Sequence, residues 1–175
     1  PAGLWVLTIL YTGLRPGETA ALFWEDIDFD RNEIHVYKAV ESGTRTIKAP
    51  KTPAGIRDIP MRQELRERLL AVRGEGTAPV FPSANGGIRS ANSLRRLWNS
   101  FAHALDLHMG AKVRDGQILQ HAIAPDLTPY CLRHTFCTDL QRAGVPINVA
   151  KELMGHANIS VTANIPITAG VKGIP

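Results

Sequence analysis

Residues 128–155 read TPYCLRHTFCTDLQRAGVPINVAKELMG and carry the start and stop signals of two successive helices. Thr128 followed by Pro129 is typical of a helix start, because a threonine side chain caps free backbone N–H groups and proline fits the first turn. Gly144 and Gly155 are typical of helix ends, where the backbone turns left-handed at little cost to glycine. The segment predicts two helices, over 130–143 and 146–154, and a third short helix after residue 158.

The hydrophobic pattern of the remaining chain predicts more helices and one small sheet. Apolar residues recur at helical spacing in four segments, over 4–14, 16–24, 61–72 and 90–107. Alternating or β-branched residues predict extended runs, over 33–40, 44–49 and 56–59, which we expect to pair as an antiparallel sheet. Residues 108–127 have no clear periodicity and predict a loop, with room for a short strand. The predicted fold class is mainly α with a small antiparallel β-sheet.

Length and composition predict one globular domain over residues 1–175. The chain has 44% hydrophobic and 21% charged residues, which excludes wholesale disorder and fibrous repeats. A helix that is under way at the first residue suggests that an N-terminal part of a longer protein is missing. The sequence has no secretory signal and no apolar run of about 20 residues, so we expect a cytoplasmic protein without a membrane segment.

The charge is positive and unevenly distributed. Twenty Lys and Arg residues face 16 Asp and Glu residues, a net charge of +4. The excess lies in 45–73, whereas 25–33 is acidic and is interpreted as a solvated loop. A regional basic excess favours a polyanionic partner such as DNA.

Four motifs occur in a fixed order. They read TGLRPGE over 12–18, KTPAGIRDIP over 51–60, TPYCLRHTF over 128–136 and LMGHANISVTANI over 153–165. In order and separation they resemble the active-site segments of the tyrosine recombinase family, the phage- and transposon-type integrases. The resemblance implies the catalytic domain of an enzyme for site-specific DNA recombination or integration, which cleaves and rejoins strands. It also implies double-stranded DNA as the partner, a homo-oligomer on that DNA, and no cofactor or metal.

The resemblance implies roles for five residues, which the chemistry makes reasonable. Arg15 and Arg133 correspond to the pair that clamps the scissile phosphate, because planar guanidinium groups meet the charge of a phosphorane. Lys51 corresponds to the general acid for the leaving 5′-oxygen, with Lys48 as the alternative. His156 corresponds to a hydrogen-bond donor to the phosphate. Tyr130 stands where the family most often has histidine, and a phenol can still donate to phosphate.

The end of the chain departs from the family pattern. Aligning residues 162–165 with the final motif puts the attacking tyrosine at Pro166, which has no nucleophile. The tail that follows lacks any tyrosine, so we expect an altered or truncated C-terminus and a chain that binds DNA without cleaving it.

Other interpretations compete with this one. The helices over 130–143 and 146–154 could form a non-catalytic helix-turn-helix module, although the apolar Ile147 and Val149 suggest packing instead. Cys131, His134 and Cys137 recur every three residues, but one helix cannot bring all three to a tetrahedral zinc ion. His134 is interpreted as structural, packing under the site, and for Tyr130 a buried core position is an equal alternative.

Overall fold

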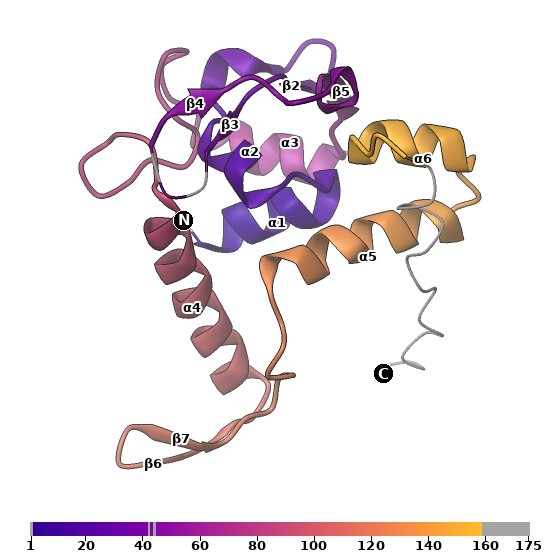
Figure 1. Ribbon diagram of the computed structural model, residues 1–175. Helices are drawn as coiled ribbons and strands as arrows, with labels where there is room; N and C mark the ends of the chain where they lie inside the picture. The colour runs from indigo at the N-terminus through magenta and orange to yellow at the C-terminus, as the bar shows by residue number, and fades with distance from the viewer. Residues whose placement is uncertain (1, 42, 44, 159–175) are drawn as a thin grey trace.

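The computed structural model describes residues 2–41, 43 and 45–158 of the chain. Its helices are α1 (Ala2–Thr12), α2 (Pro16–Ala20), α3 (Gln63–Leu70), α4 (Ala91–His108), α5 (Pro129–Arg142) and α6 (Ile147–Met154) (Figure 1). Its strands are β1 (Ile27–Asp28), β2 (Glu33–Val36), β3 (Ala39–Val40), β4 (Ile47–Lys48), β5 (Arg57–Pro60), β6 (Lys112–Arg114) and β7 (Gln117–Gln120). The predicted class, mainly α with small antiparallel β-structure, is confirmed.

The strands form three small sheets where the sequence predicted one. β1, β2 and β5 pair antiparallel in that order, with Ile34 opposite both Ile27 and Ile59. β3 pairs with β4, and β6 with β7. The expected continuous strand over 33–40 is wrong, because Tyr37 and Lys38 interrupt it.

The acidic run over 25–33 is not the solvated loop that we expected. Asp26 is only 2% exposed and accepts hydrogen bonds from Tyr37 Oη at 2.8 Å, Lys38 Nζ at 2.9 Å and the backbone N–H of Phe23 at 2.8 Å. The predicted helix over 16–24 also ends early, at Ala20, and a short 3-10 turn follows at Trp24–Asp26. The buried carboxylate of Asp26, directly before β1, therefore joins this part of the chain to Tyr37 and Lys38, the two residues that interrupt the expected strand.

Residues 108–127 contain a hairpin rather than a loop. Strands β6 and β7 turn at Asp115 and Gly116, which have φ of +51° and +77°. Asp-Gly is a strong signal for such a two-residue turn, and the sequence contained it. The hairpin projects from the far end of α4 (Figure 1). The Asp106 carboxylate holds its base by accepting from the backbone N–H groups of Ala122 at 2.6 Å and Ile123 at 3.2 Å.

Helix α1 runs through the hydrophobic core and sets the position of α5. Trp5 and Ile9 of α1 are fully buried together with Leu65 and Leu69 of α3. α5 packs along α1, and Phe136 forms a second apolar cluster with residues of α5 and α6. This packing brings the end of α1 next to α5 and α6 although more than 110 residues separate them in the sequence. No described helix is long and apolar enough to cross a membrane.

Candidate phosphate-binding site

Arg15 is presented by a tight turn between α1 and α2. Gly13 ends α1 with a φ of +63°, and a Cβ there would lie 2.4 Å from Phe136, so only glycine fits. Leu14 is fully buried and anchors the turn. Arg15 then precedes α2, and its side chain is 37% exposed. The turn therefore places one partly exposed guanidinium group beside the buried start of α2.

Glu18 neutralises part of the charge around Arg15. Its carboxylate accepts from Arg15 Nη1 at 2.8 Å, from Arg57 Nη2 at 2.9 Å and from Arg57 Nη1 at 3.1 Å. It also accepts from the backbone N–H of Arg15 at 2.7 Å, which caps the start of α2. Burial alone would raise the pKa of Glu18, but the hydrogen bonds and charge of Arg57 lower it below its usual range. Glu18 is therefore ionised and joins two arginines.

Arg133 reaches the same place from α5 and is 5% exposed. It donates to the carbonyls of Gly13 and Met154, and its Nη2 lies 3.0 Å from His156 Nε2. Because a guanidinium group can only donate, Nε2 accepts, and the neutral imidazole carries its hydrogen on Nδ1. Burial, followed by the charge of Arg133, lowers the pKa of His156 to about 4, so the ring is neutral at neutral pH.

The burial of Arg133 is incompletely compensated by negative charge. Burial, and then the positive charge of Arg15, lower the pKa of Arg133 to about 9, which leaves it charged at neutral pH. Among the described residues, Glu18 is the carboxylate that bonds this cluster, and it bonds Arg15 and Arg57, whereas Arg133 bonds two backbone carbonyls and His156. Two positive charges thus remain in a small volume, and such a cluster attracts an anion.

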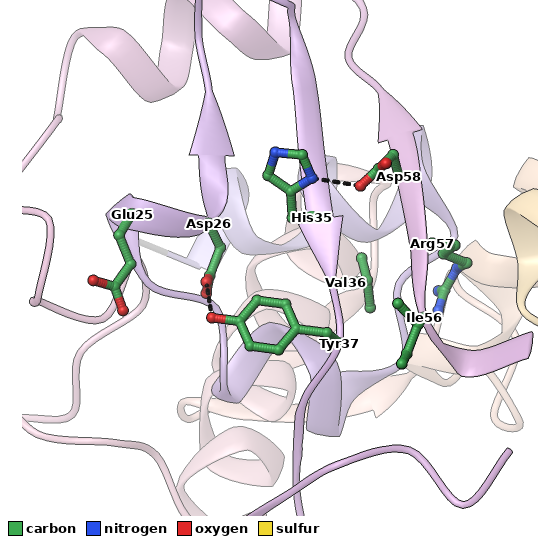
Figure 2. Close-up of a pocket in the computed structure, with 8 residues that line it drawn as sticks. All are labelled: Glu25, Asp26, His35, Val36, Tyr37, Ile56, Arg57 and Asp58. Atoms are coloured by element: carbon green, nitrogen blue, oxygen red, sulfur yellow. Dashed lines mark hydrogen bonds and ion pairs between the residues drawn. The ribbon is translucent and has the colours of Figure 1, made fainter. Parts of the chain in front are cut away.

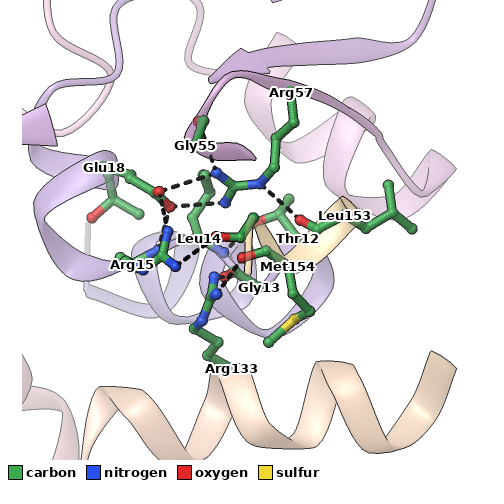
Figure 3. A network of polar contacts seen from close by, with 12 residues as sticks. Thr12, Gly13, Leu14, Arg15, Glu18, Gly55, Arg57, Arg133, Leu153 and Met154 are labelled. Atoms are coloured by element: carbon green, nitrogen blue, oxygen red, sulfur yellow. Dashed lines mark hydrogen bonds and ion pairs between the residues drawn. The ribbon is translucent and has the colours of Figure 1, made fainter. Parts of the chain in front are cut away.

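The C-terminal end of α6 lies among these three arginines (Figure 3). Three successive carbonyls, of residues 153–155, accept from Arg57 Nε at 2.8 Å, from Arg133 Nη2, and from Arg15 Nη2 at 3.0 Å. The last carbonyls of a helix have no partner within the helix and carry the negative end of its dipole. The arginines therefore cap α6, and His156 follows directly after the capped turn.

A groove of about 970 Å³ opens beside Arg15. Lys51 and Tyr130 also line it, and both are exposed, Tyr130 to 54%. Lys48 lines the groove as well, but its Nζ is 2.7 Å from Glu41 Oε1. The groove thus brings together three of the five predicted site residues. Arg133 and His156 do not line it; they bond each other and the backbone beside Arg15.

Several expectations about individual residues are wrong. For a pair that clamps a phosphate we expected Arg15 and Arg133 to face each other with no carboxylate nearby, but Arg15 pairs with Glu18 at 2.8 Å. His134 is exposed and does not pack under the site, and Tyr130 is not a core residue. In α6, Ala150 and Met154 are buried, but Ile147 and Val149, which we expected to pack, are 41% and 38% exposed. Pro166 and the expected third helix lie outside the described residues.

Arg57, like its partner Glu18, is a site residue that the motifs did not predict. Its side chain is almost fully buried and bonds Glu18 and the Leu153 carbonyl. The signal was present, because β5 alternates: Arg57 and Ile59 are buried and point to the same face, whereas Asp58 is exposed. A charged residue at an inward-facing strand position needs a buried partner.

A second hollow lies over β2 and β5, and its polar side chains are already paired. Figure 2 shows His35 turned toward Asp58, and the Tyr37 hydroxyl turned toward Asp26. The hollow has a volume of about 570 Å³ and is open. We therefore place the candidate site at the arginine cluster.

Comparison with known proteins shows the family of the chain. Residues 3–165 match the Phage integrase family. The tyrosine recombinase XerC-like protein of Caldanaerobacter subterraneus subsp. tengcongensis is 32% identical over 165 residues, which is 88% of this chain and 42% of that protein. The transposase from transposon Tn916 of Enterococcus faecalis is 29% identical over 162 residues, 91% of this chain and 40% of that protein.

Solved structures agree as well. The Tn1549 transposon integrase in complex with circular intermediate DNA has a TM-score of 0.73 at 27% identity, over 96% of this chain and 56% of that chain. The XerA recombinase shares the fold, with a TM-score of 0.63 at 22% identity over 93% of this chain and 51% of that chain. This chain spans about two fifths of the length of the curated relatives. It belongs to the phage integrase family.

Proposed function

We propose that this chain is the catalytic domain of a site-specific DNA recombinase, which binds a backbone phosphate of double-stranded DNA at the arginine cluster but cannot cleave the strand. The observation that carries this proposal is the charge of the cluster. Among the described residues, three guanidinium groups lie together beside an open groove, and one carboxylate, that of Glu18, bonds two of them, Arg15 and Arg57. A phosphate group has the charge and the acceptor geometry to complete such a set.

The relatives support DNA as the partner. The Tn1549 integrase was solved in complex with circular intermediate DNA, and it is similar over nearly all of this chain. Relatives also carry the names tyrosine recombinase and transposase. By extension we propose double-stranded DNA as the ligand of this chain and assembly into a homo-oligomer on that DNA.

The proposed role of each site residue follows from how exposed its side chain is. Of the three clustered arginines, Arg15 is the one that lines the groove, and it would contact the phosphate first. Arg133 supplies buried positive charge beside it, and His156 Nδ1–H is a neutral donor. Lys51 is exposed at the groove, where it could donate a proton to a leaving oxygen, and Tyr130 could hydrogen-bond the backbone. Together they would stabilise negative charge that develops at phosphorus.

The missing nucleophile limits the chemistry to binding. The match to the family ends at residue 165, directly before Pro166, where the family motif leads us to expect tyrosine. Proline has no hydroxyl group to attack phosphorus, and none of the other site residues replaces it. The proposed outcome is a non-covalent complex with intact DNA.

One experiment tests both halves of the proposal. The chain is mixed with a duplex that carries a nick near its centre, and the mixture is run on a native gel and on a denaturing gel. We expect a shifted band on the native gel and no protein–DNA band on the denaturing gel. A covalent band would mean that another residue is the nucleophile, with Tyr130 or Tyr11 examined first. The absence of a shifted band on the native gel would contradict the proposed DNA binding.

Restoring the nucleophile requires more than one substitution. Pro166→Tyr alone should leave covalent attachment undetectable, because Ile167 and Thr168 no longer match the segment that orients the tyrosine, and a misplacement of about 1 Å can cost on the order of a hundredfold in rate. A chain whose residues 166–175 are replaced by a family-like tail should form the band.

The alternative of a helix-turn-helix module gains no support from α6. Its exposed surface includes the apolar side chains of Ile147 and Val149, and its C-terminal end is buried among the arginines. A recognition helix instead presents polar side chains to base edges. The predicted discriminator still applies: a helix-turn-helix would show base preference, whereas a phosphate clamp would not.

A further inference from the structure

Arg57 connects two parts of the site that come from distant segments. Its Nη1 and Nη2 atoms grip both oxygens of Glu18 in α2, at 3.1 and 2.9 Å. Its Nε donates to the Leu153 carbonyl at the end of α6, at 2.8 Å. The guanidinium group is planar and fixes the directions of these donors, so one side chain sets the distance between α2 and α6.

Gly155 is shaped to accept Arg57. A Cβ at Gly155 would lie 2.8 Å from Arg57 Nη1, closer than real Cβ contacts, and 3.1 Å from the Ala54 carbonyl oxygen, which is a tight contact. Gly155 also has a φ of +61°, which strains any other residue. The guanidinium group therefore packs directly against the turn that leads from α6 into His156.

We infer that Arg57 is a positioning residue of the proposed phosphate site: it holds the end of α6 so that His156 meets Arg133, while it keeps Glu18 in place beneath Arg15. This inference rests on the proposed function for its consequence in DNA binding, but the positioning itself is a property of the free protein. Arg57 is itself too buried to contact DNA, because its side chain is 2% exposed.

Lysine cannot replace Arg57 in this role. An ammonium group is a point charge that could still neutralise Glu18, but it cannot also reach the Leu153 carbonyl with a second, fixed donor. Arg57→Lys therefore keeps the charge of the cluster and removes the link to α6. If Arg57 only balances charge or stabilises the fold, Arg57→Lys should leave the pKa of His156 unchanged. If Arg57 positions the end of α6, the substitution should change that pKa.

The test compares Arg57→Lys with Arg66→Lys in the 175-residue chain. Arg66 is a matched control, because its Nε and Nη2 also donate to a backbone carbonyl, that of Phe29, at 3.2 Å, outside the arginine cluster. Three quantities are measured: thermal unfolding, the pKa of the His156 imidazole by NMR titration, and affinity for a nicked duplex. Groups that face His156 are Arg15, Arg57, Arg133 and His134, and neither substitution changes the formal charge at any of these positions.

We expect Arg57→Lys to raise the pKa of His156 by at least about one unit toward its free value and to weaken DNA binding about tenfold, the effect of losing one charge-assisted contact. Arg66→Lys should change neither. If Arg57→Lys lowers the melting temperature but leaves the pKa of His156 and DNA affinity as in the unsubstituted chain, Arg57 is only structural and the inference fails. Should Arg57→Lys fail to fold, the double variant Glu18→Gln/Arg57→Met, which removes the buried pair together, is compared by hydrogen exchange at the His156 amide, which bonds the Lys151 carbonyl at the end of α6 at 3.1 Å, and unchanged exchange overturns the inference.

The two proposals fail in different ways. If the unsubstituted chain does not bind DNA, the proposed function fails, and the His156 titration still decides whether Arg57 positions the site. If the chain binds DNA and the pKa does not move, only the positioning role is lost.

Discussion

Replacing Glu18 by glutamine tests whether one carboxylate holds the arginine cluster together. Glu18 is 6% exposed and accepts four hydrogen bonds, three from guanidinium groups and one from the backbone. Removing one partner of a buried ion pair costs roughly 3–5 kcal/mol, because the remaining charges stay buried without compensation. At about 2–4 °C per kcal/mol for a chain of this size, the melting temperature should fall by about 6–20 °C.

Glu64→Gln is the matched control, measured in the same thermal unfolding assay. Glu64 pairs with Arg68 at 3.2 Å, but both side chains are at least half exposed, and such pairs contribute about 0–1 kcal/mol. Added sulfate should restore part of the stability of Glu18→Gln, since an anion can take the place of the lost carboxylate, and should affect Glu64→Gln little. Equal and small shifts for the two variants would refute the reasoning.

Three further predictions concern single residues. Gly155→Ala should destabilise the chain by about 1–3 kcal/mol in urea unfolding, because its φ is +61° and the Cβ meets Arg57; Gly144→Ala, with a φ of +74° in open space, should cost only about 1–2 kcal/mol. The pKa of His156 is lowered to about 4 in the folded chain, so on acidification the unfolded chain takes up a proton at this histidine first, and the free energy of unfolding should fall as the pH drops from about 6.5 to about 4. In His156→Gln the melting temperature should depend less on pH over this range. An unchanged pH dependence would contradict the buried, neutral state of His156. Asp106→Asn should speed hydrogen exchange at the amides of Ala122 and Ile123, because both N–H groups donate to the Asp106 carboxylate. Unchanged exchange would mean that the base of the hairpin does not depend on this carboxylate.

The helices could be predicted because their start and end signals are local. Thr128-Pro129, Gly144 and Gly155 mark the ends of α5 and α6 almost to the residue. The strands were harder, since pairing depends on distant partners: nothing near Tyr37 indicates that its hydroxyl bonds Asp26 and breaks the strand. The hairpin of β6 and β7 was a missed local signal.

The hydrogen bonds that join the candidate site could not be predicted from the sequence. The motifs pointed to Arg15 and Arg133 together, and α1 and α5 do bring them together. Their partners could not be read from the motifs, because Glu18 and Arg57 are joined across 39 positions and the α6 carbonyls are backbone atoms without a sequence signature. Only the inward position of Arg57 in β5 hinted at a buried charge pair.

The salt dependence of DNA binding tests most directly whether the arginine cluster holds a phosphate. Each phosphate contact contributes about −0.9 to the slope of log K against log salt concentration for duplex DNA, whatever the base sequence. Arg15→Ala should make the slope shallower by about that amount, whereas Arg68→Ala, on the exposed face of α3 and outside the groove, should leave it unchanged. A slope that stays the same in Arg15→Ala would contradict phosphate binding at this site.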